Sequence, residues 1–269
     1  MCDFSCFGTL CAPKRADPFE ADNDAQLAKM ERSVSHYNMG TVYQSQGKLD
    51  EAIESYRYSI RLDPTNYKAH YNLGSVLQEM DKLNEASECY EKAIELKENH
   101  LMSHYNLGYI KHQIGDIDSA LLHFQTAAKL DPQDVDTHIM IGNILRQKGM
   151  LSEAVTAYRN AADQDHNCVM AYYNLGNTLH DLGKYNEAIQ EFESAIRIEP
   201  ELIHAHFNLG IAYQGMKDLE NALRCYEIAA QLDPNFNEAV QAVEYVRNKM
   251  AQGKKGKGQV MVSQNFRRK

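Results

Sequence analysis

The sequence predicts an all-α solenoid of six helix pairs and a capping helix, because one segment returns every 34 residues. Its versions are His36-Tyr37-Asn38-Met39-Gly40, His70-Tyr71-Asn72-Leu73-Gly74, His104-Tyr105-Asn106-Leu107-Gly108, His138-Ile139-Met140-Ile141-Gly142, Tyr172-Tyr173-Asn174-Leu175-Gly176 and His206-Phe207-Asn208-Leu209-Gly210. With this glycine as position 8 of a 34-residue frame, position 20 is always alanine and position 24 always aromatic. A fixed period of this length indicates units that pack only on their neighbours.

Each unit is expected to form two antiparallel helices, over residues 33–66, 67–100, 101–134, 135–168, 169–202 and 203–236. Glycine near the middle of a unit separates its two helices, at Gly47, Gly115, Gly149 and Gly183. Proline at position 32 ends the second helix in four units, and Asn66 or Asp134 is suited to cap the helix that follows. The small side chains at positions 8 and 20 permit close helix approach, and the aromatic at position 24 is expected to fill the space between units.

The period and the residues at positions 8, 20, 24 and 32 resemble the tetratricopeptide repeat (TPR). This resemblance implies a right-handed α-solenoid of six TPR helix pairs, and it covers residues 33 to 250. Position 32 departs from the pattern at Glu98 and His166. The resemblance further implies a non-catalytic scaffold or adaptor for protein binding.

The two ends of the chain lie outside the repeats. Residues 1–22 are expected to be flexible, and a helical segment begins at Asn23. A capping helix is expected over residues 237–250, where Glu244 replaces the repeated glycine, and residues 251–269 form a basic tail that is expected to be flexible. The TPR array therefore spans residues 23–250.

Charge and composition limit the class of partner. The formal net charge is −9, and because residues 247–269 hold eight Lys and Arg and no acid, the rest of the chain carries −17. The acidic remainder of the chain would repel the phosphate backbone of a nucleic acid, so nucleic-acid binding is expected only through the basic tail. The absence of a long apolar run and of a signal sequence predicts a cytosolic or nuclear protein, in which Cys89, Cys168 and Cys225 are reduced core residues.

The sequence has few candidates for metal ligands or catalytic residues. Histidine recurs at position 4 (His36, His70, His104, His138 and His206), but these positions are about one helix pair apart, too far for ligands of one metal ion. We therefore expect packing histidines, no metal and no cofactor. None of the common catalytic motifs occurs, so an enzyme is not expected.

A candidate peptide-binding surface lies opposite the packing side of each first helix. Position 6 is the informative row: Asn38, Asn72, Asn106, Met140, Asn174 and Asn208. An amide at a regular pitch suits an extended peptide backbone, whose donors and acceptors also recur regularly. The row resembles the asparagine ladder in the TPR region of O-GlcNAc transferase, which grips peptide main chain; no glycosyltransferase domain follows it here. Alternatively, Tyr-Asn-Leu-Gly is simply a common TPR sequence and its asparagine has no special role in binding.

Further residues complete this predicted concave groove. They are Tyr71, Tyr105, Tyr173, Asn143, Asn177 and Arg146. The ladder is interrupted at Ile139-Met140, which predicts an apolar spot that fixes the register of a ligand, with Arg146 further along the same helix. The TPR mode that clamps two carboxylates is not expected, because its three cations are replaced by Ile139, His204 and Asn208.

The alternative function is targeting of the chain within the cell. Cys2, Cys6 and Cys11 are candidates for S-acylation, which would attach the chain to a membrane, and unmodified thiols in a disordered tail are the plainer reading. Three thiols without a nearby histidine do not make a zinc site. The basic tail suits nuclear import, anionic lipid or RNA, or is simply solvated.

Overall fold

The computed structural model describes residues 18–266, with side-chain detail for residues 23–252. This part of the chain forms thirteen helices and no strand. The first and second helices of the predicted units are α1 (Pro18–Ser45) with α2 (Leu49–Leu62), α3 (Tyr67–Glu79) with α4 (Leu83–Leu96), α5 (Leu101–Gln113) with α6 (Ile117–Leu130), α7 (Val135–Gln147) with α8 (Leu151–Gln164), α9 (Val169–Asp181) with α10 (Tyr185–Ile198), and α11 (Ile203–Gly215) with α12 (Leu219–Leu232). The last helix is α13 (Asn237–Phe266).

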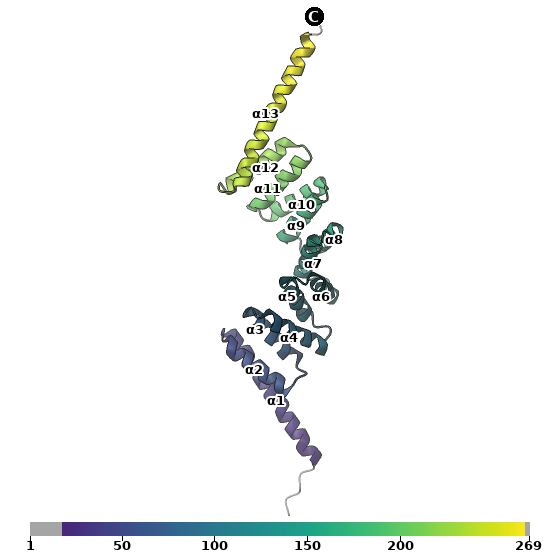
Figure 1. Ribbon diagram of the computed structural model, residues 1–269, viewed down its shortest axis with the longest axis vertical. Coiled ribbons are helices and arrows are strands. Elements are labelled where there is room, and N and C mark those ends of the chain that lie inside the picture. The colour runs from purple at the N-terminus through teal and green to yellow at the C-terminus, as the bar shows by residue number, and fades with distance from the viewer. Residues whose placement is uncertain (1–17, 267–269) are drawn as a thin grey trace, which may run out of the picture. The chain divides into compact units, whose positions relative to one another are not determined.

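The helices are divided between two compact units, of which the first ends at Leu107 and the second begins at Gly108, within α5. In the first unit α1 packs on α2, and α3 packs on both α2 and α4. In the second unit α7, α9 and α11 each pack on the second helix of their own pair, and α13 packs on α12 (Figure 1). The predicted helix pairs are thus present in both units.

The core of each repeat is a contact between the glycine at position 8 and the aromatic ring at position 24 of the same repeat. An ideal Cβ on Gly142 would lie 2.5 Å from Cε1 of Tyr158, and one on Gly176 would lie 2.8 Å from Cδ1 of Phe192. The rings at position 24 and the alanines at position 20 are buried. The expected close approach is confirmed, and the ring that requires it belongs to the same repeat.

The turn inside each repeat uses one left-handed residue, at position 15. Its φ is +70° at Gly47, +85° at Gly115, +75° at Gly149 and +74° at Gly183. In the other two repeats the same conformation is held by Asp81 and Lys217, with φ of 60° and 63°. The predicted breaks between helices are confirmed, and the turn is the same in the two repeats that lack glycine.

Side-chain caps begin several helices. The Asn66 side chain accepts a hydrogen bond from the backbone N–H of Ala69 at 3.2 Å, and Asp134 accepts one from Thr137 at 3.0 Å. Both caps were predicted. Asp116 and Asp218 cap α6 and α12 in the same way, which satisfies donors that the first turn of a helix leaves unpaired.

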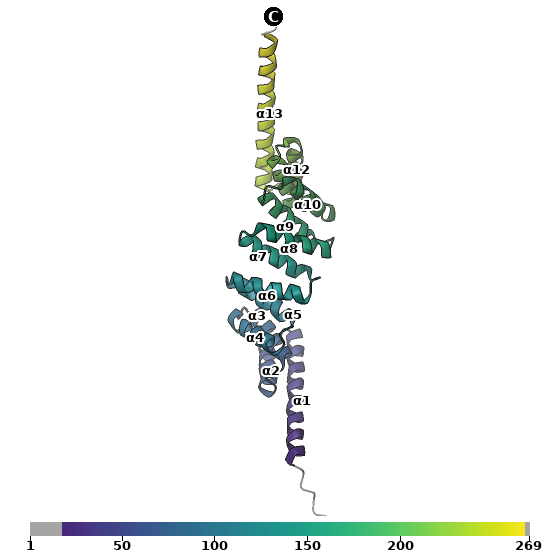
Figure 2. The ribbon, with the colours of Figure 1, turned by 90° about the vertical axis from the view of Figure 1, so that its right-hand side faces the viewer.

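The first and last helices are longer than predicted. α1 begins at Pro18 rather than Asn23, because proline is well tolerated in the first turn of a helix. α13 continues past residue 250 to Phe266, where a flexible tail was expected (Figure 2). No proline lies between Asn237 and Phe266 to end the helix, and each glycine in it costs only about 1 kcal/mol relative to alanine.

The predictions for the extreme N-terminus lie outside the described residues. Cys2, Cys6 and Cys11 precede Pro18, so their modification stays a prediction. No helix in residues 18–266 combines the length and the apolar character that a membrane span requires.

Candidate functional site

The asparagines at position 6 link consecutive first helices. Three of the five donate from their amide nitrogen to the hydroxyl of the tyrosine at position 5 of the preceding repeat. Three such bonds are formed: Asn72 to Tyr37 at 3.1 Å, Asn106 to Tyr71 at 3.4 Å and Asn208 to Tyr173 at 3.1 Å. We call the surface formed by positions 5, 6, 9 and 12 of the first helices the polar face.

A second row of hydrogen bonds joins the polar face to the buried ring at position 24. The tyrosine hydroxyl donates to glutamine at position 12 in three repeats: Tyr56 to Gln44 at 2.9 Å, Tyr90 to Gln78 at 2.9 Å and Tyr226 to Gln214 at 3.1 Å. Burial raises the pKa of Tyr56 to about 12, so its hydroxyl stays protonated and can donate. Where position 24 is Phe124 or Phe192, position 12 is histidine. The sequence shows this pairing once the two positions are compared, but we did not predict it.

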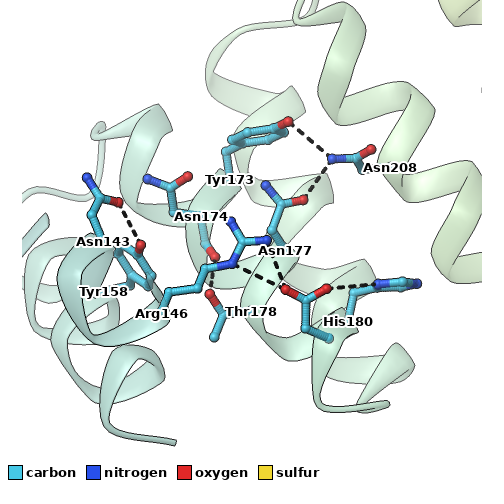
Figure 3. A network of polar contacts seen from close by, with 10 residues as sticks. Asn143, Arg146, Tyr158, Tyr173, Asn174, Asn177, Thr178, His180 and Asn208 are labelled. Atoms are coloured by element: carbon cyan, nitrogen blue, oxygen red, sulfur yellow. Dashed lines mark hydrogen bonds and ion pairs between the residues drawn. The ribbon is translucent and has the colours of Figure 1, made fainter. Parts of the chain in front are cut away.

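Two asparagines of the ladder keep their side-chain amides unengaged in the described structure. Asn38 lies in the first repeat, so no earlier repeat supplies a tyrosine. For Asn174 the residue at position 5 of the preceding repeat is Ile139, which has no hydroxyl. The Asn174 backbone carbonyl accepts a bond from Thr178 at 2.7 Å, while its carboxamide remains available (Figure 3).

Around Asn174, the polar face of α7, α9 and α11 carries further polar side chains. Arg146 donates from Nε and Nη2 to Oδ2 of Asp181, at 3.2 and 2.9 Å. The Tyr158 hydroxyl donates to Asn143 at 2.7 Å, and Asn208 also donates to Asn177 at 2.7 Å (Figure 3). Arg146 was predicted as a groove residue, but its charge is already neutralised by Asp181.

The surface near this network is shallowly hollowed. A hollow of about 450 Å³ is lined by Asn143, Arg146, Gln147, Leu151, Tyr158 and Asp181. In the first unit a hollow of about 380 Å³ is lined by Ser75, Gln78, Glu79 and Asn106. Both hollows lie on the polar face, and most of the residues that line them have polar side chains.

The apolar spot for a ligand side chain at Ile139-Met140 stays a prediction. Ile139 is half-buried and packs with its neighbours against a cluster of Ala161, Ala162 and Ala171. Its side chain therefore contributes to the core between two repeats, because the neighbouring small alanines admit it there. Met140 is also half-buried. One consequence of this break for the site is the unengaged carboxamide of Asn174.

Comparisons with known families agree with the repeat geometry. Models described as "TPR repeat" match residues 40–81, 142–183 and 176–217, and models described as "Tetratricopeptide repeat" match residues 67–100, 103–134 and 204–236. The chain belongs to the tetratricopeptide repeat family. A comparison with curated protein sequences finds no match.

Solved TPR structures show the same all-α repeat solenoid. The structure of YrrB, described as a TPR protein with an unusual peptide-binding site, aligns with a TM-score of 0.66 and 22% identity, over 71% of this chain and 99% of YrrB. MamA aligns with a TM-score of 0.59 and 22% identity, over 62% of this chain and 97% of MamA. PilF of Pseudomonas aeruginosa aligns with a TM-score of 0.62 and 16% identity, over 82% of this chain and 99% of PilF.

The repeated histidines of this TPR array tie the start of one repeat to the end of the previous one. In four repeats Nε2 of the histidine at position 4 lies within hydrogen-bond distance of the backbone carbonyl six residues earlier: His70 to Pro64 at 3.1 Å, His104 to Glu98 at 2.9 Å, His138 to Pro132 at 2.9 Å and His206 to Pro200 at 2.9 Å. His36 has no such turn before it and stacks on Tyr58, with ring centroids 4.1 Å apart. The histidines pack as predicted, and four of them also bond a carbonyl in the turn that follows the preceding helix.

Groups suited to metal or thiol chemistry are sparse in the described residues. No cluster of three or more His, Cys, Asp or Glu side chains there has the geometry to hold a metal ion. Cys89, Cys168 and Cys225 are free thiols, and of the three predicted core residues only Cys225 is buried, while Cys89 and Cys168 are half-buried. Burial raises the pKa of both Cys89 and Cys225 to about 11, so these two thiols are protonated at neutral pH and poorly nucleophilic.

Proposed function

We propose that this TPR chain is a non-catalytic scaffold that holds an extended segment of a partner protein along its polar face. The family supports this proposal, because TPR repeats are typically non-catalytic protein-binding units. The peptide-binding site of YrrB supports it by analogy of fold. A partner helix is the other ligand that such a surface suits, and the regular amides favour the extended segment.

The observation that carries the proposal is the unengaged carboxamide of Asn174. A free peptide offers alternating N–H and C=O groups, and one carboxamide can accept from the first and donate to the second. Asn106 and Asn208 each donate two hydrogen bonds within the chain, so they chiefly offer their carbonyl oxygen to a peptide N–H, whereas Asn72 donates one and keeps one amide hydrogen. In this scheme each unit has its own anchor, Asn174 for a segment bound to the second unit and Asn38 for one bound to the first.

Electrostatics favour a ligand without strong charge at this place. The Arg146 guanidinium and the Asp181 carboxylate neutralise each other beside Asn174. An acidic ligand side chain would compete with Asp181 for Arg146, and a basic one would compete with Arg146 for Asp181. We therefore expect a peptide whose central residues are polar or small, held mainly through its backbone.

The proposal is tested by replacing Asn174 in the full chain. Partners are captured with the parent protein, and the bound segment is defined on overlapping peptides. Asn174→Ala is expected to weaken binding of that peptide by about 0.5 to 1.5 kcal/mol for each hydrogen bond lost. Folding should be unaffected, since the side chain makes no intramolecular hydrogen bond. The control is Asn186→Ala, an exposed asparagine on α10; equal affinities for the two variants would refute the proposal.

A second pair of variants tests the effect of a single hydroxyl at position 139. Ile139→Tyr supplies the group that the other repeats use to engage asparagine, whereas Ile139→Phe supplies a ring of nearly the same size without it. If Asn174 binds the peptide, the tyrosine variant should bind more weakly than the phenylalanine variant, because the hydroxyl competes for the amide. The expected difference is about 2- to 10-fold in Kd, and the two variants should melt at similar temperatures.

A further inference from the structure

One large aromatic side chain is exposed on the polar face of the second unit. Tyr109 lies at position 9 of the third repeat, in α5, and is 38% exposed. Within residues 23–252 its hydroxyl has no hydrogen-bond partner and its ring stacks on no other ring. The ring surface of Tyr109 is therefore open to a ligand. The other repeats have smaller side chains at this position, namely Thr41, Ser75, Asn143, Asn177 and Ile211.

On this surface, position 9 lies beside position 6 of the following repeat. Asn208 of α11 donates to Asn177 of α9 at 2.7 Å, and these two residues are 31 apart in the sequence (Figure 3). Tyr109 of α5 and Met140 of α7 have the same separation and the same positions in the frame. They therefore occupy the places that the two asparagines occupy in α9 and α11.

Hydrogen bonds at other positions show that the two pairs of helices share one register. Nε2 of His112 in α5 lies 3.1 Å from Oε1 of Gln147 in α7, and the two residues are 35 apart. In α9 and α11, Asn208 donates to the hydroxyl of Tyr173, which is also 35 residues away. Because α5 and α7 are aligned as α9 and α11 are, the exposed tyrosine ring lies beside the methionine.

The two side chains suit an apolar partner. Ile139 packs in the core between repeats, so Tyr109 rather than Ile139 accompanies Met140 on the polar face. An aromatic ring offers a large, rigid apolar surface, and the unbranched methionine thioether adapts to the shape of its neighbour. One repeat further, the equivalent residues are Asn143 and Asn174. The polar face thus changes from an apolar pair to a pair of amides between consecutive repeats.

We propose that Tyr109 and Met140 bind a large apolar side chain of the partner segment, such as leucine, methionine or phenylalanine. This inference rests on the function proposed above, in which Asn174 holds the backbone of the same segment. The helices α7 and α9 contact each other directly, so equivalent positions on them are about 10 Å apart, a distance that about three residues of an extended peptide span. The ligand therefore carries its large apolar residue about three residues from the one that Asn174 holds.

The probe for this inference is a phage library of short random peptides, selected on the full chain. Selection on the parent chain should enrich peptides that share a large apolar residue at one place, flanked on one side by small or polar residues. Selection on Tyr109→Ser, which gives α5 the side chain that Ser75 supplies in the second repeat, should not enrich that residue. Both proteins should melt at similar temperatures, because the Tyr109 side chain is exposed and its hydroxyl has no partner in the described structure.

Titration of a synthetic pair of peptides then measures the discrimination. One selected peptide is made with its apolar residue and with serine in that place. The parent should bind the serine peptide at least about 5-fold more weakly, because a buried apolar contact is lost. In Tyr109→Ser and in Met140→Asn the difference should shrink to less than about 2-fold. Tyr109→Phe keeps the ring and should discriminate as the parent does, as should the control Tyr245→Ser, which alters a tyrosine on α13 that is 54% exposed.

The outcomes separate this inference from the proposed function. Full discrimination by Tyr109→Ser would overturn the inference, and a weaker affinity of Asn174→Ala for the same peptide would then still support the polar face as the binding surface. Peptides whose affinity changes with neither Asn174→Ala nor Tyr109→Ser would refute both. A library that yields no binder to the parent chain would also count against both.

Discussion

At the scale of single residues, one hydroxyl decides what an asparagine at position 6 offers to a ligand. Asn72, Asn106 and Asn208 each donate to a tyrosine 35 residues earlier in the chain. Asn174 does not, because Ile139 occupies that place. The asparagine row itself could be predicted from the sequence, since it repeats with the frame. The difference within the row could not, because it depends on a contact between repeats whose direction only the structure shows.

Replacement of Gly142 by alanine is predicted to destabilise the fold. An added Cβ would lie 2.5 to 2.8 Å from three atoms of the buried Tyr158 ring. Gly142→Ala should therefore lower the free energy of unfolding by about 1 to 3 kcal/mol, measured by chemical denaturation. Tyr158→Leu removes the ring that the added Cβ would meet. The double variant should therefore lose less free energy of unfolding than the sum of the losses of Gly142→Ala and Tyr158→Leu. Strict additivity would show that the ring is not the obstacle.

His70 is predicted to make stability depend on pH. Burial lowers the pKa of His70 below its ordinary value of 6.5, with the Pro64 carbonyl opposing this in part, and burial also lowers the pKa of His100. As pH falls through about 6.5, the unfolded chain therefore takes up protons before the folded chain does, and stability is lost. The melting temperature of the parent should fall between pH 7.5 and 5. His70→Tyr should reduce this fall, and His70→Tyr with His100→Gln should reduce it further; an unchanged pH slope would contradict the assignment.

At the scale of helices and turns, the repeat frame predicted the break inside four of the six repeats and two of the helix caps. Helix breaks at Gly47, Gly115, Gly149 and Gly183 and caps at Asn66 and Asp134 all follow from residues with strong local preferences. The predicted start of α1 and the predicted end of α13 were wrong: α1 already begins at Pro18, and no proline lies between Asn237 and Phe266 to end α13 at residue 250. The turns at Asp81 and Lys217 are fixed by packing of the two helices, which imposes a left-handed residue even without glycine.

The left-handed backbone conformation of Lys217 predicts a stabilising substitution. A left-handed conformation costs a residue with a side chain roughly 1 to 2 kcal/mol, partly offset by the greater freedom of glycine in the unfolded chain. Lys217→Gly should therefore raise the free energy of unfolding by about 0.5 kcal/mol. Gly149→Ala should lower it by about 1 kcal/mol, although no atom lies within 4 Å of the added Cβ. Opposite signs in thermal melts of the two variants support the account, and equal signs contradict it.

At the scale of the whole molecule, α13 closes the second unit with its first four turns. Val243 and Val246 are buried against Ala222 and Tyr226, and Met250 packs beside them. Deletion of residues 253–269 should therefore leave the melting temperature within about 2 °C, whereas Val246→Asp should lower it clearly, because it buries an unpaired charge. A large loss of stability on the deletion would show that the end of α13 also supports the fold.

The central claim, that a partner segment lies along the polar face, is tested most directly by hydrogen exchange of the full chain with and without a captured peptide. The peptide should slow exchange in the first helices, above all around Asn174 in α9 and in the neighbouring α7 and α11. The second helices α8 and α10 should exchange as they do in the free protein. Protection confined to those second helices, with none around Asn174, would contradict the proposed binding surface.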